Sequence, residues 1–358
     1  MLHIADLFLA VLRPFLLVSG LALVSLLVFL VLKHGVDEIH YRRRQRIIAH
    51  YRPVVDSLLG PVPSDDVFLV LSRVPARHRP VLETMLLRPL ALSTGSVVDR
   101  LRNAARVSGL IDEWATKLSD RRWWIRAEAT RALGLAREIH ALPRIYRALD
   151  DDHEEVRAAA VESLGLIRHP DAIQALLERL ADQSRHQRAR VVEALREFGD
   201  RATPALIAHA RRRPEDAVMV AEVLEQIGGH EAADEMKSWT LDERPDVRAA
   251  ALHALGTIGL DDEGVALTVR SLEAPEAPVR AMAARALGRV RRADIARVLA
   301  THLDDEWLVA ATAADALRKT GRAGIDLLEA RVSDAGYAGD LARQMLWERR
   351  TAAAGGLA

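Results

Sequence analysis

The chain of 358 residues contains no cysteine, which excludes disulfides, thiolate metal sites and cysteine nucleophiles. It has no net charge, with 50 basic and 50 acidic residues, whereas a dedicated nucleic-acid binder usually carries an excess of positive charge. Aromatic residues make up only 4%, and the β-branched runs that indicate a sheet are missing. Half of the residues are apolar, and alanine and leucine dominate. We therefore expect an all-α fold.

The sequence also lacks the motifs of common enzyme classes. It has no Walker loop, no Gly-rich dinucleotide motif, no G-x-S-x-G elbow and no HExxH pair. The run "DDDHEE" from Asp150 to Glu155 contains metal-ligand types, but no second ligand set is spaced to converge on it. We interpret it as a tight turn between helices with an aspartate as N-cap. We predict no catalytic residues, no metal, no cofactor and no small-molecule substrate.

The sequence has one long apolar run near its start, "FLLVSGLALVSLLVFLVL" from Phe15 to Leu32. It has no charged residue and is nearly long enough as a helix to cross the hydrocarbon core of a bilayer. We expect residues 1–33 to form a membrane anchor whose span covers about 15–32. Whether residues 1–14 extend this helix or lie at the interface stays open.

Basic residues gather after this run in "HYRRRQR", which begins at His40. The positive-inside rule then places the carboxyl-terminal bulk in the cytoplasm, at the inner membrane of the cell. We expect residues 34–52 to form a basic juxtamembrane helix with an apolar side of Ile39, Ile47, Ile48 and Tyr51, lying at the interface. Its basic collar, which we expect to contact anionic lipid, consists of Arg42, Arg43, Arg44 and Arg46.

Prolines are concentrated in the following segment: residues 51–90 hold six of the fourteen. Proline disrupts helix interiors, so we expect only short helices between these positions. We assign residues 53–109 as a connector with capping helices, and residues 351–358 as a disordered tail.

A repeat of about 31 residues fills the chain between these segments. Each copy has a leucine that is preceded, four and one residues earlier, by small or β-branched residues that form one stripe of a helix. Amphipathic stretches between the copies make each repeat a helical hairpin, and stacked hairpins complete a continuous core. The register leucines are Leu133, Leu164, Leu195, Leu224, Leu255, Leu287 and Leu317.

The "VRxxAxxALG" segments and an aspartate six residues before the arginine resemble HEAT repeats of the short bacterial type also found in phycobilisome lyases. The resemblance covers roughly residues 110–350 and implies an α-solenoid of about eight or nine hairpins. It also implies that the aspartate–arginine pairs link neighbouring hairpins into a ladder, which is interrupted near Val218 and Ala310. The pairs are Asp120 and Arg126, Asp151 and Arg157, Asp182 and Arg188, and Asp242 and Arg248.

The residues two before each leucine are the ones we expect to face the concave groove of the solenoid. They form a mixed row with an acidic centre, which suits a charged protein surface better than a nucleic acid; a merely solvated face is the alternative. The row is Arg131, Glu162, Glu193, Glu222, His253, Arg285 and Asp315. Trp123 and Trp124 are interpreted as packing residues, with an aromatic anchor for a partner as the alternative.

These features predict a single-pass membrane protein whose cytoplasmic solenoid is a non-catalytic scaffold or adaptor. Resemblance to membrane-tethered HEAT proteins implies a membrane-associated protein partner, such as an envelope polysaccharide glycosyltransferase or a signalling protein. One alternative is an enzyme with bilin lyase or isomerase activity, as in phycobilisome lyases. A second is a nucleic-acid clamp, although we predict no nucleic-acid partner.

Overall fold

The computed structural model describes residues 2–61, 63, 65–180 and 185–355; within these ranges the side chains of residues 2–22, 24, 65, 185–186 and 352–355 are left aside. The described residues form helices and no strand, as the composition predicted. The chain divides into two compact units, residues 1–141 and 142–358, and each is described by itself.

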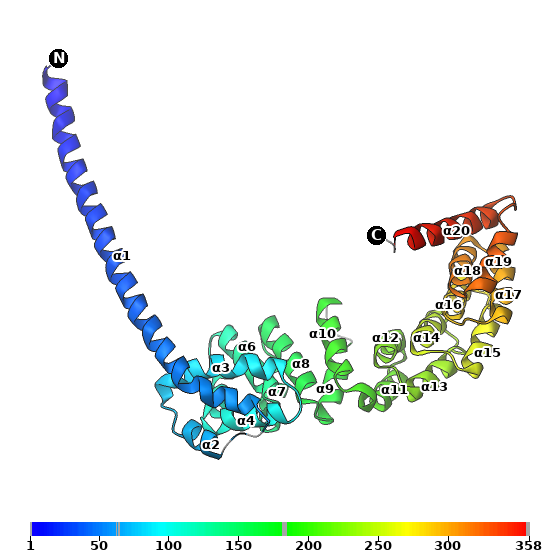
Figure 1. Cartoon of the computed structure of the whole chain (residues 1–358), viewed down its shortest axis with the longest axis horizontal. Coiled ribbons are helices and arrows are strands. Elements are labelled where there is room, and N and C mark those ends of the chain that lie inside the picture. The colour runs from blue at the N-terminus through cyan, green and yellow to red at the C-terminus, as the bar shows by residue number, and fades with distance from the viewer. Residues whose placement is uncertain (1, 62, 64, 181–184, 356–358) are drawn as a thin grey trace. The chain divides into compact units, whose positions relative to one another are not determined.

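The first unit combines one very long helix with shorter ones (Figure 1). The last turns of the long helix, α1, pack on α3 and α4, and Tyr51, Val55 and Leu58 of α1 are buried there. The elements are α1 (Leu2–Leu59), α2 (Asp65–Ser72), η1 (Ala76–His78), α3 (Arg79–Leu92), α4 (Ser96–Val107), α5 (Leu110–Lys117), α6 (Trp123–Leu135) and η2 (Ile139–Ala141).

Helix α1 differs from our expectation in two ways. It continues through Pro53, and α3 likewise contains Pro89, so the prediction that prolines confine this region to short helices is wrong. Ile47 and Ile48 are half-buried and Tyr51 is buried against the unit, and therefore most of the expected lipid-facing apolar side is a packing surface. Tertiary burial here outweighs the lost hydrogen bond at a proline.

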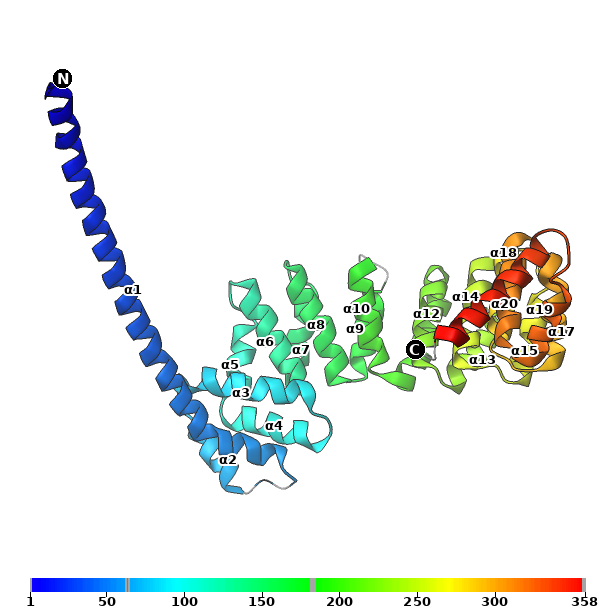
Figure 2. The same cartoon turned by 45° about the horizontal axis from the view of Figure 1, so that its top comes forward.

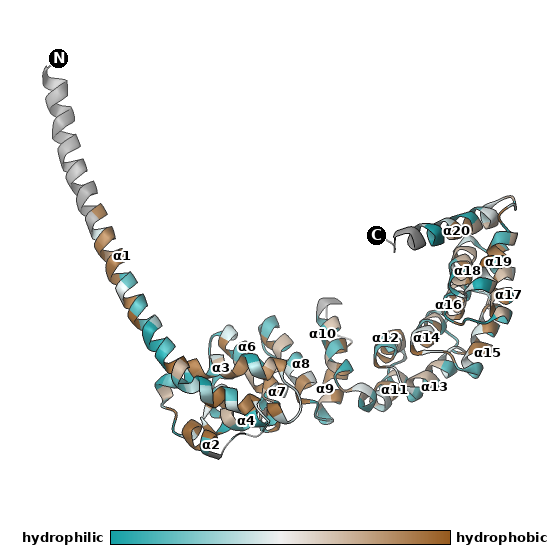
Figure 3. Cartoon of the chain, viewed as in Figure 1, coloured by the Kyte–Doolittle hydropathy of each residue, from teal (hydrophilic) through white to brown (hydrophobic). Residues whose placement is uncertain are grey.

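Further toward the amino terminus, α1 exposes a run of large apolar side chains. Leu23, Phe29 and Leu32 are 70%, 60% and 65% exposed, and the side chains between them that the structure describes are exposed as well. Figure 3 shows the change on α1 from hydrophobic to hydrophilic colouring after this run. Among the residues searched, no helix combines the length and apolarity needed to cross a membrane. Residues 15–22 and Val24 of the expected span lie outside the described side chains.

The second unit stacks helical hairpins in two layers, seen from two directions in Figures 1 and 2. The A layer consists of α7 (Leu142–Ala148), α9 (Asp171–Glu178), α11 (Thr203–Arg212), α13 (His230–Trp239), α15 (Asp262–Ser271), α17 (Ala293–Thr301) and α19 (Arg322–Ala330). The B layer consists of α8 (Glu154–Ile167), α10 (Arg185–Arg196), α12 (Ala217–Ile227), α14 (Pro245–Ile258), α16 (Ala277–Leu287) and α18 (Trp307–Lys319). Short helices η3 (Gly199–Ala202), η4 (Pro214–Asp216) and η5 (His302–Asp304) join them, and α20 (Tyr337–Gly355) packs on α18 and α19. Helix α20 thus occupies residues 351–355, where we expected a disordered tail.

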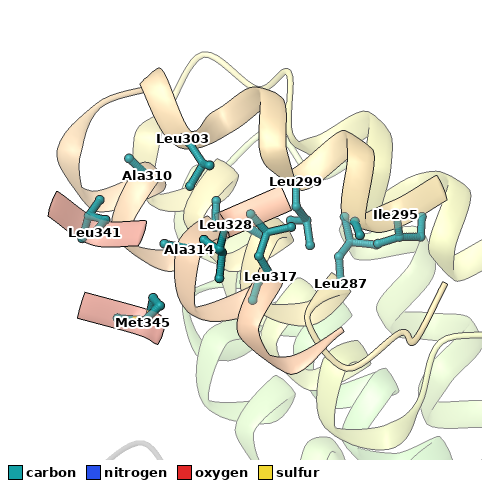
Figure 4. Close-up of a cluster of buried hydrophobic side chains, with 14 of the residues drawn as sticks. Leu287, Ile295, Leu299, Leu303, Ala310, Ala314, Leu317, Leu328, Leu341 and Met345 are labelled. Atoms are coloured by element: carbon teal, nitrogen blue, oxygen red, sulfur yellow. The ribbon is translucent and has the colours of Figure 1, made fainter. Parts of the chain in front are cut away.

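The repeat register explains this packing. All seven register leucines are fully buried, and the small residues four and one positions before them are buried as well, which confirms the predicted stripe. Figure 4 shows part of the core, where Leu287, Leu299, Leu317 and Leu328 converge from four different helices. Each fully buried leucine contributes about 1.5–3 kcal/mol relative to an exposed one.

Candidate functional site

Six of the seven residues of the predicted row lie on helices of the B layer, and Arg131 lies on α6 of the first unit. Glu162 accepts a hydrogen bond from Arg190 at 2.8 Å, and Glu193 accepts one from Arg196 at 3.0 Å. His253 lies 3.5 Å from Glu225. Most of the row is therefore already paired within the chain, which the sequence pattern alone did not reveal.

The pairing is tightest at Asp315. Burial alone would raise the pKa of this carboxyl, but hydrogen bonds from Lys319 and Arg318 outweigh burial and hold the pKa below its usual range. By contrast, Glu222 and Arg285 are exposed, and no salt bridge within the described residues involves either one. These two are the members of the row best placed to meet charges of a partner.

The ladder arginines bind differently from the predicted pairing. Arg248 donates from Nη1 to the backbone carbonyl oxygens of Asp242 (2.7 Å) and Glu243 (2.9 Å), while the Asp242 carboxylate accepts from the Arg244 backbone N–H. Arg126 and Arg157 contact the carbonyls of Asp120 and Asp151 in the same way. The arginine thus closes the turn before its own helix.

The link to the next hairpin comes from the other side of the guanidinium. Arg248 Nη2 donates to Glu276 at 2.6 Å, and Arg280 binds Asp305 through Nε (2.9 Å) and Nη2 (2.7 Å). The Arg280 hydrogen bond lowers the pKa of Asp305 to about 2. Asp182 lies outside the described residues, so its expected pairing with Arg188 is not described.

The turn at "DDDHEE" has the expected role with a different capping residue. His153, not an aspartate, is the N-cap of α8, and its Nδ1 accepts from the Glu155 backbone N–H at 3.2 Å. The Asp151 carboxylate accepts from the His153 N–H at 2.9 Å. The acidic residues then lie in the first turn, where the helix dipole favours them.

The sequence did not reveal a charged cluster around Lys237, because this residue and two of its partners are far apart in the chain. Lys237 on α13 donates to Asp261 at 2.6 Å and to Asp234 and Glu263, both at 3.1 Å. These hydrogen bonds, Asp261 first, raise the pKa of the Lys237 ammonium, and Lys237 in turn lowers the pKa of Asp261. The cluster ties α13 to the start of α15.

The first unit contains a groove of about 520 Å³ beside α6, which we call the α6 groove. Its walls come from α3, α5 and α6, and its apolar floor is flanked by charged side chains. It is lined by Glu83, Thr84, Leu87, Lys117, Ile125, Glu128, Ala129, Arg131, Ala132 and Leu135. Arg131 of the predicted row therefore lies in this groove.

Trp123 and Trp124 stand at the start of α6, next to the groove. Their rings meet edge to face with centroids 5.9 Å apart, and they are 38% and 48% exposed. Trp124 shares one face of α6 with Glu128, Arg131 and Leu135, because these residues are spaced by four, three and four. Trp124 thus lies on the face of α6 whose other residues line the groove.

Residues 111–196 match the family model described as HEAT repeats. This segment of the chain is similar to HEAT repeats. The match covers the part of the chain from α5 to α10, and the buried leucine register continues from there to α18. No curated protein matches the chain.

Several solved structures are similar to this chain at low identity. An engineered protein is 18% identical over 82% of this chain and 97% of its own, with a TM-score of 0.35. The CpcE–CpcF complex of phycocyanin lyase from Nostoc sp. is 20% identical over 61% of this chain and 92% of its own (TM-score 0.31). Kap121p is 12% identical over 82% of this chain and 44% of its own (TM-score 0.40). What these proteins bind or catalyse is a property of those proteins.

Proposed function

We propose that the chain is a non-catalytic HEAT-repeat scaffold that α1 tethers to the cytoplasmic face of a membrane, where the solenoid binds a membrane-associated protein. The observation that carries this proposal is the continuity of α1. One helix joins the exposed apolar run up to Leu32 to the buried Tyr51, Val55 and Leu58 of the first unit. Exposed apolar surface of this extent is typical of a membrane or protein contact.

The basic collar fits this arrangement with one geometric condition. Ten residues separate Leu32 from Arg42, which is about 15 Å along a helix axis. The headgroup layer adds only about 5–8 Å to each side of the hydrocarbon core. Arg42, Arg43, Arg44 and Arg46 are exposed. Direct contact of Arg42 with the headgroups would need a tilt of about 60°, which exceeds the range of about 0–40° for membrane helices. At a smaller tilt the collar attracts anionic lipid through its electric field, which acts over a Debye length of about 8 Å.

The absence of cysteine makes the orientation directly measurable, because a single introduced cysteine has no background. Glu154→Cys places a thiol on an exposed position of α8. We expect an impermeant maleimide to label this thiol in cells whose inner membrane has been opened, and not in cells whose inner membrane is intact. Labelling in cells whose inner membrane is intact would overturn the orientation.

The partner-binding part is tested by reversing charges on the B layer. We expect Glu222→Lys combined with Arg285→Glu to reduce the partner recovered by affinity capture from solubilised membranes, since both side chains are exposed. A matched control reverses Glu273 and Arg322, which are also exposed but lie outside the row. Equal recovery with the row variant and with wild type would contradict the proposed binding surface.

A further inference from the structure

The α6 groove borders one particular side of α6. In the other repeats, the corresponding side of each B helix from α10 onward packs against the preceding B helix. In the second unit, the residue after the register leucine of one B helix meets the residue before the register leucine of the next. A Cβ built on Gly288 of α16 would lie 2.8 Å from Cα of Ala316 in α18, and one on Gly165 of α8 would lie 2.9 Å from Cα of Ala194. By register, Ala132 is the α6 residue that corresponds to Ala316.

No helix runs alongside α6 on this side within the described part of the first unit. Helix α3 crosses α6 instead, as both views show (Figures 1 and 2), and their contact is short. The space left beside Leu87, Ile125 and Leu135 is the α6 groove. Its volume lies within the range of about 300–1,000 Å³ that is typical of binding clefts.

The lining of the groove has two acidic residues, Glu83 and Glu128, and two basic ones, Lys117 and Arg131. The exposed carboxylate of Glu128 indicates what the occupant carries at this end of the groove. Glu83 is engaged, because it accepts from Trp114 Nε1 at 2.6 Å and lies 3.5 Å from Lys117. Glu128 is exposed, and no salt bridge within the described residues involves it. It lies one helical turn from the exposed ring of Trp124, and a carboxylate beside an indole face suits an arginine or lysine.

We propose that the α6 groove binds an amphipathic helix of a partner protein, with apolar side chains against Leu87, Ile125 and Leu135 and a basic side chain at Glu128 and Trp124. This inference rests on the proposed scaffold function and gives it a docking site in the first unit. The binding mode is a helix laid in a groove. It would repeat, within the first unit, the kind of stacking that holds the B layer of the second unit together.

A peptide of residues 277–291, APVRAMAARALGRVR, is a suitable probe. It is the sequence of α16 and its flank, which packs on the corresponding face of α18, and it has four arginines and no acidic residue. An environment-sensitive dye on Thr84→Cys reports its binding, because Thr84 is exposed on the groove and the chain has no other cysteine. The full-length chain is used, in mild detergent.

We expect saturable binding of this peptide, weakened about five- to tenfold by Glu128→Lys and by Trp124→Ala. Trp307→Ala is the matched control, since Trp307 is 66% exposed and lies in the second unit, and it should leave binding unchanged. The peptide of residues 154–168 has the same register with three acidic residues and two arginines, and it should bind more weakly.

The absence of saturable binding, or equal binding to the wild type and to both groove variants, would overturn the proposal. Sedimentation velocity of the unlabelled chain tests the other occupant. A concentration-dependent dimer that Trp124→Ala abolishes would show that a second copy fills the groove, and would also overturn it. None of these measurements involves a membrane, and none of the substitutions changes a row residue of the chain, so a failure here is distinct from a failure of the proposed function.

Discussion

At the scale of single residues, the closest helix contacts of the repeats depend on glycine. Gly165, Gly256 and Gly288 each follow a register leucine, and a Cβ at any of them would lie within 3.0 Å of the next B helix. Glycine normally weakens a helix interior by about 1 kcal/mol relative to alanine. Its presence here is explained by the close approach of two backbones.

We predict that Gly256→Ala destabilises the chain by about 1–3 kcal/mol, because the new methyl would lie 2.9 Å from Cα of Ala286 and force the helices apart. Urea unfolding followed by circular dichroism measures the change. Gly35→Ala is the control: Gly35 lies inside α1, and apart from its chain neighbours and the nearby backbone of α1 no atom lies within 4 Å of its built Cβ, so the same substitution should be neutral or slightly stabilising. A loss of similar size in both variants would contradict this explanation.

A second residue-scale prediction concerns pH. Arg280 lowers the pKa of Asp305 to about 2, so the pair stabilises the fold fully above about pH 4 and loses its contribution as the pH falls toward 2. We expect Arg280→Gln to be less stable than wild type at pH 7, and the difference to shrink between pH 4 and pH 2. Urea midpoints measured across this range provide the test.

Arg285→Gln is the control for this titration. Arg285 is on the same helix but has no salt bridge within the described residues, so its difference from wild type should not change with pH. A constant difference for Arg280→Gln across the same range would show that the pair does not act through the Asp305 carboxylate.

At the scale of elements, one arginine links the end of α1 to another helix of the first unit. Arg100 on α4 donates from Nε to the Leu58 carbonyl at 2.9 Å and from Nη2 to the Gly60 carbonyl at 2.7 Å. These carbonyls have no intrahelical partner at the end of a helix. The guanidinium therefore caps α1 and fixes it to α4.

We expect Arg100→Met to speed amide hydrogen exchange in residues 51–59 about tenfold, because two charge-assisted hydrogen bonds are lost. Arg102→Met is the comparison, since Arg102 on the same helix pairs, among the described residues, with Asp99 one turn away and with no other carboxylate. Unchanged exchange in Arg100→Met would show that the buried side chains alone hold α1 in place.

At this scale, features that depend on neighbouring residues in the sequence could be predicted, and features that depend on packing between distant helices could not. The buried stripe with Leu164 or Leu255 was predictable, because helical periodicity alone places those side chains on one face. The continuation of α1 through Pro53 was not, since it depends on Tyr51 and Val55 packing against distant helices. The ladder arginines were found in the sequence, but their bonds to backbone carbonyls depend on the shape of the turn. The α6 groove was missed because α3 and α6 are separated in the sequence by two further helices.

At the scale of the whole molecule, we propose that α1 tethers the solenoid scaffold to a membrane. The single most direct measurement is extraction of membranes with alkaline carbonate, comparing the wild type with the double variant Leu26→Lys and Phe29→Lys. Both positions are exposed on α1, at 54% and 60%, so the substitutions should leave the folded units intact. We predict that the wild-type chain stays in the membrane pellet and that the variant moves to the supernatant, because each buried lysine costs about 2.5–3.5 kcal/mol in a membrane helix. Release of the wild-type chain by carbonate would contradict the claim.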